Sequence, residues 1–486
     1  MNLGRMLAES AGKYPENVAV IHGGHRITYR ELERAACALT NHLRALGLNR
    51  GDKLAIMLPN CPEFIIAYFG IQKLGGVAVT LNVQSTSYEL RHLLGNSDAK
   101  CLITQAVLSK RFTEIRDELP LCRHLIETNG SGEDSPFRKI VEAGPFTTEI
   151  PDLGGDDPAA MIYTAGLTGK PLGAVLTHRN LVTQSILLRT ICRRDEGEDI
   201  ALAVIPFFHS FGAVANMLAP LRMGSGVVLM ERFTLDGIFE AIEKEKVSYI
   251  AAVPRLFLGM FFHEGADKYR VDSLKICITG GAAMPPDFIP PFEQKFGVKI
   301  MEGYGLTEAS PVSSFSRLDM PQKPGSIGTP IPGVEAKIVD ADGRELPRGA
   351  VGELILKGEN VMKGYYKEEE ATARVIQNGW LYTSDLGRMD DDGYIFLTGR
   401  KKRMIITSGF NVYPREIEIV LELHPAVREA RIVGKEDLLR GEIVKAVVVK
   451  KPGAEIEERE LLKHCRAYLS TYKVPREIEF AERIEG

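Results

Sequence analysis

An acidic side chain and an arginine flank a short predicted strand in the segment from Trp380 to Glu418. Asp385 follows a Thr-Ser pair that we interpret as a turn, and Arg400 follows Gly399 at the end of the strand. A carboxylate can accept hydrogen bonds from both hydroxyls of a ribose, and a guanidinium can donate to a ribose or to a phosphate. This pair of residues therefore predicts a site for a nucleoside.

A second segment has the composition of an anion-binding loop. It reads MIYTAGLTGKPLGAVLTH, and a strand is expected to end at its Tyr163. Two glycines would let backbone N–H groups approach an anion, and two threonines offer hydroxyls to phosphate oxygens. These residues are Gly166, Gly169, Thr164 and Thr168. The segment is not a Walker loop, because Pro171 follows Lys170 where Ser or Thr is required. Taken alone, such a Gly/Thr segment is more often an ordinary turn.

Alternating elements must position these residues. Short β-branched runs alternate with amphipathic helical patterns before Gly399, which predicts parallel sheets covered by helices and hence an α/β fold. The expected strands are Lys53–Met57, Val77–Leu81, Cys101–Thr104, Ile200–Ile205, Gly226–Met230, Ser248–Ala252 and Lys275–Thr279. The expected helices are Pro62–Leu74, Asn180–Arg189 and Leu235–Glu245, with Asn180 as a helix start.

The pattern changes towards the C-terminus. From about Gly325, Gly and Pro punctuate short strands, which is typical of a smaller β-rich subdomain. Beyond Arg400, strands are expected at Ala430–Val433 and Val444–Val449, with a helix near Glu458–Leu469. A Gly-Phe-Asn turn at residues 409–411 is expected to lead into another helix.

Bulk properties exclude several classes of protein. At 486 residues the chain should hold two or more domains. A net charge of -4 with 26% charged residues does not indicate the excess of basic residues that is typical of a protein that binds nucleic acid. The seven cysteines are scattered without a CxxC spacing, which favours a reduced cytoplasmic protein without a zinc site. The N-terminal residues lack the apolar core of a signal peptide.

One uncharged stretch is long enough to span a bilayer but is interrupted. Ile200 to Leu221 carries no formally charged residue, yet it contains Pro206, Gly212 and Pro220. A buried strand followed by a loop and a short helix fits this pattern better, so no integral membrane segment is expected.

Together the segments resemble the adenylate-forming (AMP-binding) superfamily, in particular its acyl-CoA synthetase branch. Besides the two segments already quoted, PFFHSFG, ITGGAA, EGYGLTE and SGFNVYP match in the order of the chain. The resemblance covers nearly the whole chain, from Ile27 to Pro475. It implies a large N-terminal domain over residues 1–399, with the β-rich subdomain at about 325–399. A small, mobile α+β C-terminal domain would cover residues 400–486 and would lack its final segment.

The resemblance also implies roles for individual residues. Those implied for the chemistry on phosphate and acid are Thr164, Thr168, Lys170, Thr307, Glu308 and His209. Those implied for nucleotide binding are Gly281, Ala282, Ala283, Gly303, Tyr304, Gly305, Asp385 and Arg400. Glu308 would hold Mg²⁺, because a carboxylate that attacks an anionic phosphorus needs that charge neutralised. A lone histidine beside phenylalanines is usually a packed core residue, so the role of His209 stays open between core and acyl site.

In this superfamily the small domain adopts two orientations, one for each half-reaction. The pivot would be Lys402, and the tunnel for the CoA thiol arm would be lined by Ser408, Gly409, Phe410 and Asn411. Glycine suits such a tunnel because the arm must pass close to the backbone.

The sequence departs from the superfamily pattern in two places. In the phosphate loop, Ala165 and Leu167 stand where hydroxyl residues are usual, and Leu172 replaces a lysine. We hypothesise that Lys170 partly compensates for the lost charge. The superfamily also carries a C-terminal Ser/Thr-Gly-Lys turn, whereas no lysine follows Lys473 here. A longer gene product, a naturally short protein and a weakened adenylation step are the three alternatives.

The predicted activity is that of an ATP-dependent acid–CoA ligase, an acid–thiol ligase of the AMP-forming type. The acid would react with ATP and Mg²⁺ to give acyl-AMP and pyrophosphate, and CoA would then displace AMP. Short-chain enzymes carry a tryptophan after the Tyr304 position, whereas Gly305-Leu306 here resembles medium-chain, long-chain and aryl members. A medium- or long-chain fatty acid is therefore favoured.

Two other functions stay open. One is a ligase that loads a carrier protein, and the other is a non-catalytic nucleotide- or acyl-binding descendant. The oligomeric state is also open, a homo-oligomer included.

Overall fold

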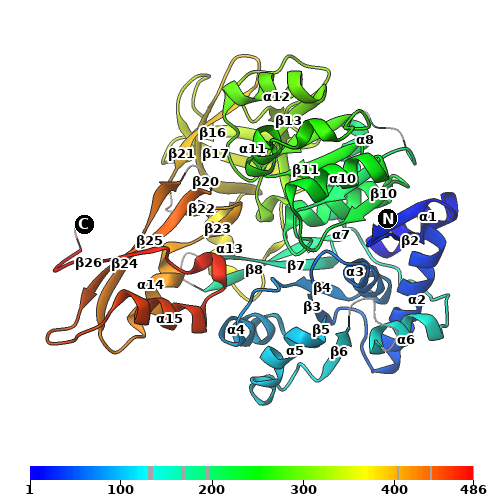
Figure 1. Ribbon diagram of the computed structural model, residues 1–486, viewed down its shortest axis with the longest axis horizontal. Helices are drawn as coiled ribbons and strands as arrows, with labels where there is room; N and C mark the ends of the chain where they lie inside the picture. Colours follow the sequence, from blue (N-terminus) through cyan, green and yellow to red (C-terminus); the bar gives the residue numbers. More distant parts are fainter. Residues whose placement is uncertain are drawn as a thin grey trace.

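The computed structural model describes residues 1–129, 135–165, 170–192, 194, 196–401, 404–437 and 440–484. In these residues the strands assemble into four sheets, and helices cover the two largest, as the sequence predicts for an α/β fold (Figure 1). A large N-terminal part carries three of the sheets, and a small C-terminal domain carries the fourth. Within the described residues, no helix is both long enough and apolar enough to cross a membrane.

The largest sheet has nine strands and is mostly parallel. The pairs that run from β1 through β10, β9, β11 and β12 to β13 are parallel, and the edge strands β2, β14 and β15 are antiparallel. In spatial order the strands are β15 (Thr329–Pro330), β14 (Val312–Phe315), β13 (Lys299–Gly305), β12 (Ile276–Thr279), β11 (Tyr249–Ala252), β9 (Ile200–Ala203), β10 (Gly226–Leu229), β1 (Val18–His22) and β2 (His25–Thr28).

A seven-stranded sheet lies on the other side of a helical layer. Its order is β18 (Gly364–Tyr365), β8 (Pro171–Thr177), β7 (Pro158–Ala165), β4 (Val77–Thr80), β3 (Lys53–Met57), β5 (Ala99–Gln105) and β6 (His124–Thr128). A smaller antiparallel sheet follows in the sequence. It consists of β16 (Val334–Val339), β17 (Gly352–Gly358), β20 (Trp380–Met389) and β19 (Ile376–Gln377), with β21 (Ile395–Arg400) paired to β20.

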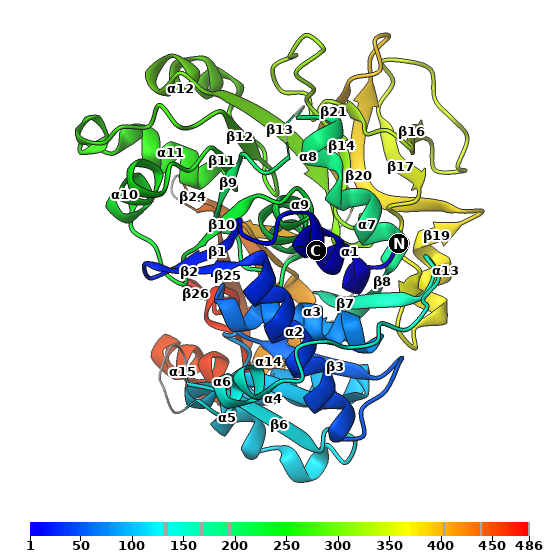
Figure 2. The same cartoon turned by 90° about the vertical axis from the view of Figure 1, so that its right-hand side faces the viewer.

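The helices form three layers around the two large sheets (Figure 2). Between the sheets lie α1 (Leu3–Lys13), α2 (Tyr29–Ala45), α3 (Pro62–Leu74), a π-helix at Gly212–Leu218 and α9 (Ala219–Arg222). The outer face of the nine-stranded sheet carries α10 (Leu235–Glu245), α11 (Pro254–Phe262) and α12 (Ile289–Phe296). The outer face of the seven-stranded sheet carries α4 (Ser87–Ser97) and α5 (Ala106–Thr113). Because both faces of each sheet are covered, strands such as β10 consist of continuous buried apolar residues.

The remaining helices are short. They are α6 (Pro136–Ala143), α7 (His178–Ser185), α8 (Leu187–Thr190), α13 (Glu369–Val375) and single turns at Arg116–Glu118, Ala266–Lys268, Pro286–Phe288 and Thr307–Ala309.

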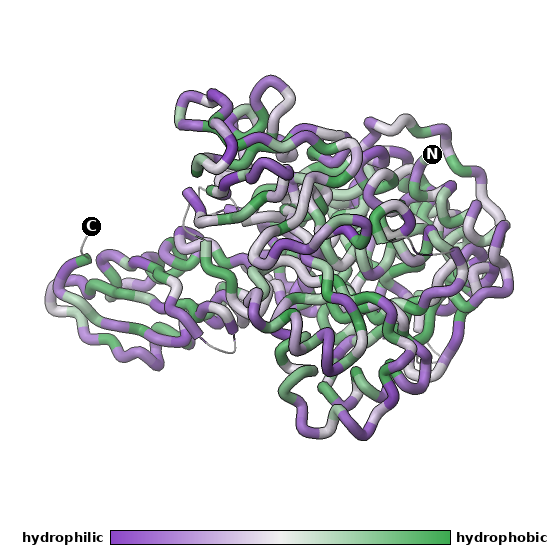
Figure 3. Tube along the Cα trace, turned by 90° about the horizontal axis from the view of Figure 1, so that it is seen from above, coloured by the Kyte–Doolittle hydropathy of each residue, from purple (hydrophilic) through white to green (hydrophobic). Residues whose placement is uncertain are grey.

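The small C-terminal domain has its own sheet and core. The sheet contains β23 (Phe410–Val412), β22 (Ile405–Thr407), β25 (Gly441–Lys450), β24 (Val427–Asp437) and β26 (Glu477–Phe480). Two helices, α14 (Pro414–Glu422) and α15 (Glu458–Tyr468), pack on it, and a short turn follows at Thr471–Lys473. Seen from above, this domain projects from the large part of the chain and carries apolar segments of its own (Figure 3).

Several predicted strands in the N-terminal part differ from the structure by one or two residues at an end, and two predicted elements have boundaries that are wrong for a physical reason. The helix expected at Asn180–Arg189 begins at His178 and is broken at Ile186. Its N-cap is Thr177, whose Oγ1 accepts the Asn180 N–H, so Asn180 is the third helical residue rather than the first. The strand expected at Ile200–Ile205 ends at Ala203. Beyond that point the carbonyls of Ala203 and Ile205 accept hydrogen bonds from the Asn60 side-chain amide rather than from the backbone of a neighbouring strand.

Three predicted turns or strand ends also differ. The strand expected to end at Tyr163 continues to Ala165, which pairs with Pro171 of β8. The Thr-Ser turn before Asp385 is an irregularity inside β20, where Ser384 has φ 64°. The turn expected at residues 409–411 is made by Ser408 and Gly409, because Phe410 and the next residue already pair with β22.

Candidate active site

One cavity of about 1340 Å³ lies between the two large sheets, the antiparallel sheet and the small domain. Every sequence-predicted site residue that the structure describes lines it, although these residues come from ten different elements and loops across the chain. The other predicted residues, Gly166, Thr168, Gly169 and Lys402, lie outside the described residues. The structure therefore brings together in one place the segments that were selected separately in the sequence.

Asp385, Arg400 and Tyr304 form a polar cluster at one end of the cavity. Strands β20 and β21 place Asp385 directly opposite Arg400. The guanidinium forms an ion pair with Oδ1 and donates from Nη2 to Oδ2 at 3.3 Å, and the Tyr304 hydroxyl also donates to Oδ2. The Asp385 side chain is 2% exposed, and this burial raises the pKa of its carboxyl while Arg400 opposes the rise. Because each carboxylate oxygen has two acceptor sites, a ribose could share the group with these partners.

The adjacent wall is built from backbone that only glycine allows. Gly281 has φ 78° at the end of β12, and it is exposed to the cavity together with Ala282 and Ala283. A Cβ on Gly305 would lie 2.0 Å from the Pro311 carbonyl oxygen, and one on Gly303 would lie 2.9 Å from the Phe315 ring. This wall therefore presents backbone rather than side chains, which suits close contact with a flat ring.

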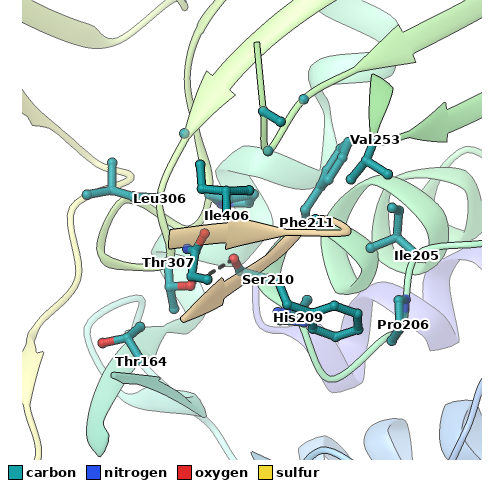
Figure 4. A pocket seen from close by; sticks show the side chains of 18 of the residues that line it. Thr164, Ile205, Pro206, His209, Ser210, Phe211, Val253, Leu306, Thr307 and Ile406 are labelled. Atoms are coloured by element: carbon teal, nitrogen blue, oxygen red, sulfur yellow. Dashed lines mark hydrogen bonds between the residues drawn. The ribbon is translucent and has the colours of Figure 1, made fainter. Parts of the chain in front are cut away.

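A group of hydroxyls surrounds Glu308 next to this wall. The Glu308 Oε1 accepts hydrogen bonds from Thr164 Oγ1 at 3.2 Å and from the Tyr365 hydroxyl at 2.7 Å. The hydroxyls of Thr307 and Ser210 share a hydrogen bond of 3.2 Å (Figure 4). Sequence reasoning missed Tyr365, because the two-residue strand β18 carries it to Glu308 from 57 positions away.

Two of the departures in the phosphate loop, Ala165 and Leu172, lie on the β7–β8 pair, and the third, Leu167, lies outside the described residues. Leu172 lies opposite Thr164 in the register of the two strands. Lys170 is exposed and lines the same cavity. This position is compatible with the hypothesis that the Lys170 ammonium replaces the positive charge missing at Leu172, and that hypothesis stays a prediction.

His209 is half-buried and packs among aromatic rings in the cavity wall. Its ring centroid lies 4.7 Å from that of Phe208 and 5.4 Å from that of Phe410. Burial lowers the pKa of His209 to about 4, so the imidazole is neutral at pH 7. Its Nε2 has no hydrogen-bond partner among the described residues. The side chain thus packs against rings and also lines the cavity, so the choice between a core residue and a residue of the acyl site stays open.

Beyond His209 the cavity is apolar. Its lining there combines residues near α8 with residues from the π-helix, α9 and β11. They are Leu187, Ile191, Cys192, Ala215, Ala219 and Tyr249. None of these side chains carries a charge, so this end suits an apolar group rather than a second carboxylate.

The turn between β22 and β23 reaches into the cavity from the small domain. Arg255 of α11 donates from Nη1 to Ser408 Oγ at 2.9 Å. Gly409 has φ 85°, and a Cβ there would lie 2.8 Å from Val253 Cγ1. The Phe410 ring stacks on Tyr472 with centroids 4.5 Å apart, and Asn411 is exposed at the strand edge. Ile406 of β22 lies among cavity residues such as Phe211 and Thr307 (Figure 4).

Glu302 is a further carboxylate in this cavity, and sequence reasoning missed it as a site residue. It lines the cavity from β13, and burial raises its pKa from 4.5 to about 7. Only the Met284 backbone opposes this rise. The one sequence signal was an acid inside an otherwise apolar strand.

Glu302→Gln is expected to stabilise the protein in a pH-dependent way. The folded state holds the Glu302 proton more tightly than the unfolded state, so its contribution to stability is present below pH 4.5 and is lost as pH rises to about 7. The variant should match the parent near pH 4.5 and exceed it by about 3 kcal/mol above pH 7. Denaturant unfolding at several pH values measures this difference, and a constant offset would show that Glu302 does not titrate in this way.

Comparison with known proteins agrees with this geometry. The family described as AMP-binding enzyme matches residues 7–366, and the AMP-binding enzyme C-terminal domain matches residues 416–485. A long-chain-fatty-acid–CoA ligase from Bacillus subtilis (strain 168) is 34% identical, covering 99% of this chain and 91% of its own length. A feruloyl-CoA synthase from Amycolatopsis sp is 35% identical, covering 99% of this chain and 95% of its own.

Solved structures show the same fold. A double mutant of o-succinylbenzoate CoA synthetase from Bacillus subtilis, bound with its product analogue OSB-NCoA, has a TM-score of 0.88 at 28% identity, over 99% of this chain and 95% of that chain. ATP-bound MatB from Rhodopseudomonas palustris has a TM-score of 0.77 at 29% identity, over 100% of this chain and 96% of that chain. From its sequence, its cavity and these relatives, the chain belongs to the AMP-binding enzyme family.

Proposed function

We propose that this protein is an ATP-dependent acid–CoA ligase that acts on an acid with an apolar tail, and that medium- or long-chain fatty acids are its best substrates. The observation that carries the proposal is the single cavity described above. It joins the Asp385 cluster, the hydroxyls around Glu308, an apolar chamber and the turn at Gly409. A nucleotide, an acyl group and a thiol arm could therefore meet in one place. One relative is named a long-chain-fatty-acid–CoA ligase and the other a feruloyl-CoA synthase, and both names support the same reaction.

In the first step an oxygen of the acid attacks the α-phosphorus of ATP, and pyrophosphate leaves. Asp385 and Arg400 would hold the ribose, and Tyr304 would lie against the base. The hydroxyls of Thr164 and Thr307 would donate to phosphate oxygens. Lys170 would contribute a positive charge and Thr168 a further hydroxyl to the binding of the phosphates.

Glu308 is the residue that would hold Mg²⁺. Among the described residues, no group of three or more His, Cys, Asp or Glu side chains could form a metal site by itself. A single carboxylate beside hydroxyls nevertheless fits Mg²⁺, which usually binds through one or two carboxylates together with substrate phosphates. When bound there, the ion would neutralise charge on the phosphates.

In the second step the CoA sulfur attacks the acyl carbonyl carbon, and AMP leaves with the oxygen that bridged the two groups. The thiol would approach past Ser408, Gly409, Phe410 and Asn411, where a glycine leaves room beside the backbone. His209 would form the wall between this turn and the acyl chamber without burying a charge.

The apolar chamber predicts how activity depends on the acid. Each buried methylene contributes about 0.8 kcal/mol, so kcat/KM should rise about fourfold per methylene until the chamber is full. Ala215 is partly exposed in the π-helix and lines the chamber. Ala215→Phe should therefore lower kcat/KM for long acids more than tenfold and leave short acids unaffected. An equal loss for acids of all lengths would contradict this assignment of the chamber.

The proposal is tested by release of pyrophosphate and AMP with ATP, Mg²⁺ and a panel of straight-chain, benzoic and hydroxycinnamic acids, with and without CoA. Acid-dependent pyrophosphate release followed by CoA-dependent AMP release is the expected result. Binding of ATP without release on any acid would favour a non-catalytic protein. Pyrophosphate release with an acyl-AMP that CoA cannot discharge would favour transfer to a carrier protein.

Several finer assignments belong to the same proposal. The chain would divide into its two domains at Gly399, with the β-rich subdomain at about 325–399 and the pivot between the domains at Lys402. The protein would be cytoplasmic and would bind no nucleic acid. A homo-oligomer is compatible with all of them, and sedimentation of the purified protein would determine the oligomeric state.

A further inference from the structure

Helix α4 of the large part holds the small domain through one buried carboxylate. Glu89 accepts a hydrogen bond from Lys473 Nζ at 2.7 Å on Oε1 and one from Ser470 Oγ at 2.6 Å on Oε2. Lys473 also donates to Glu416 Oε1 at 2.6 Å. Glu89 and Lys473 are each 7% exposed, and Glu416 is 8% exposed. Two nearby contacts extend the interface, from Thr86 Oγ1 to the carbonyl of Tyr468 and between the rings of Tyr88 and Tyr468.

The two carboxylates around Lys473 differ in origin. Lys473 and Glu416 both belong to the small domain, so their ion pair survives wherever that domain lies. Glu89 belongs to α4, so its contacts with Lys473 and Ser470 exist only when the two parts are placed as they are here. Charged hydrogen bonds in such a dry environment are strong, so these contacts stabilise the present placement of the small domain. The pKa of Glu89 is accordingly lowered by Lys473 despite its burial.

The same placement brings the Gly409 turn into the cavity. Ser408 meets Arg255, Gly409 faces Val253 and Phe410 lies against His209 in this arrangement. In the proposed function this turn lines the path of the thiol arm, so the present arrangement is the one that suits the CoA step.

We propose that Glu89 is a positioning residue for the thioester-forming step: its contacts with Lys473 and Ser470 hold the small domain where the 408–411 turn faces the acyl group. This inference rests on the proposed function, because it assigns the turn to the thiol arm. Glu89 touches no reacting atom in this account and acts only through the placement of the small domain.

Glu89→Gln tests this role without disturbing α4. Glu89 is also the third residue of a capping box with Thr86, and glutamine serves equally well in that motif. A matched control exists in α2, where Glu31 occupies the same position in a capping box with Thr28 and is exposed to solvent. Glu31→Gln therefore makes the same change at the same place in a helix, but away from the small domain. Ser470→Ala removes one of the two donors from the opposite side.

The two half-reactions are measured separately. In Glu89→Gln, the discharge of preformed acyl-adenylate at saturating CoA should slow about tenfold or more, while pyrophosphate release without CoA is unchanged. Ser470→Ala should slow the same step about threefold. Glu31→Gln should leave both half-reactions at the parent rate. Equal losses in both half-reactions of Glu89→Gln, or a loss that saturating CoA overcomes, would overturn the inference.

Domain placement is measured without substrates by energy transfer between two dyes. The seven native cysteines are buried, so Val107→Cys on α5 and Lys463→Cys on α15 would be labelled selectively at exposed sites. Transfer efficiency should change in Glu89→Gln and stay at the parent value in Glu31→Gln. If Glu89→Gln matches Glu31→Gln, the inference is wrong. A parent protein that forms no acyl-adenylate would contradict the proposed function, and the transfer measurement would still decide whether Glu89 sets the placement.

Discussion

Replacing Glu308 by glutamine is expected to slow acyl-adenylate formation by about 10²- to 10³-fold. Glutamine keeps an oxygen that can accept the hydrogen bonds from Thr164 and Tyr365, so the local structure should survive. What it loses is the negative charge that would hold Mg²⁺ beside the phosphates. The measurement is single-turnover pyrophosphate release without CoA over a series of Mg²⁺ concentrations, and the variant should require more Mg²⁺ than the parent.

Glu302→Gln is the matched control for this effect. It removes a carboxylate from the same cavity at a position that makes no contact with Thr164 or Tyr365. Its rate of pyrophosphate release should fall far less than that of Glu308→Gln. Equal rates for the two variants would mean that any loss reflects the charge of the cavity as a whole, and the assignment of Mg²⁺ to Glu308 would be wrong.

Gly409→Ala is expected to slow the CoA-dependent step by about 10²-fold and to leave adenylation unchanged. The added Cβ would lie 2.8 Å from Val253 Cγ1 at a residue with φ 85°, which displaces the turn from the cavity wall. Stopped-flow measurement of acyl-adenylate discharge separates this step from the first one.

Gly453→Ala controls for the strain of the backbone alone. Gly453 also lies in the small domain, with φ 74°, but a Cβ there would meet nothing within 4 Å. This variant should discharge the adenylate at the parent rate. Adding Val253→Ala to Gly409→Ala should restore part of the lost rate. A Gly409→Ala protein with full activity towards CoA would show that the thiol arm takes another path.

The sequence predicts those parts of the site that depend on local chemistry. Asp385 and Arg400 could be paired from their types and from the short strand between them, and the structure places them opposite each other. Gly281 was recognisable because its segment ends a predicted strand, whereas Gly303 was assigned only through the resemblance. The parallel sheets followed from buried β-branched runs, since both faces of such strands are covered.

The sequence could not predict contacts that depend on long-range packing. Tyr365 reaches Glu308 through a two-residue strand, and no spacing in the sequence indicates that pairing. Glu89 and Lys473 are 384 positions apart in the sequence. From the sequence alone, Glu89 would be interpreted as a helix-capping residue and Lys473 as a surface lysine. The π-helix in the acyl chamber has no composition signal of its own, because it is rare and is favoured only by its packing.

The measurement that most directly tests the central claim is the fate of oxygen from an acid labelled with ¹⁸O in both carboxylate positions. If the acid attacks the α-phosphorus of ATP and CoA then displaces AMP, one labelled oxygen must bridge the acyl and phosphoryl groups and leave with AMP. Mass spectrometry of the products of a single turnover should therefore show AMP that carries one ¹⁸O and an acyl-CoA that retains the other. Labelled inorganic phosphate together with ADP, or unlabelled AMP, would contradict a mechanism through an acyl-adenylate.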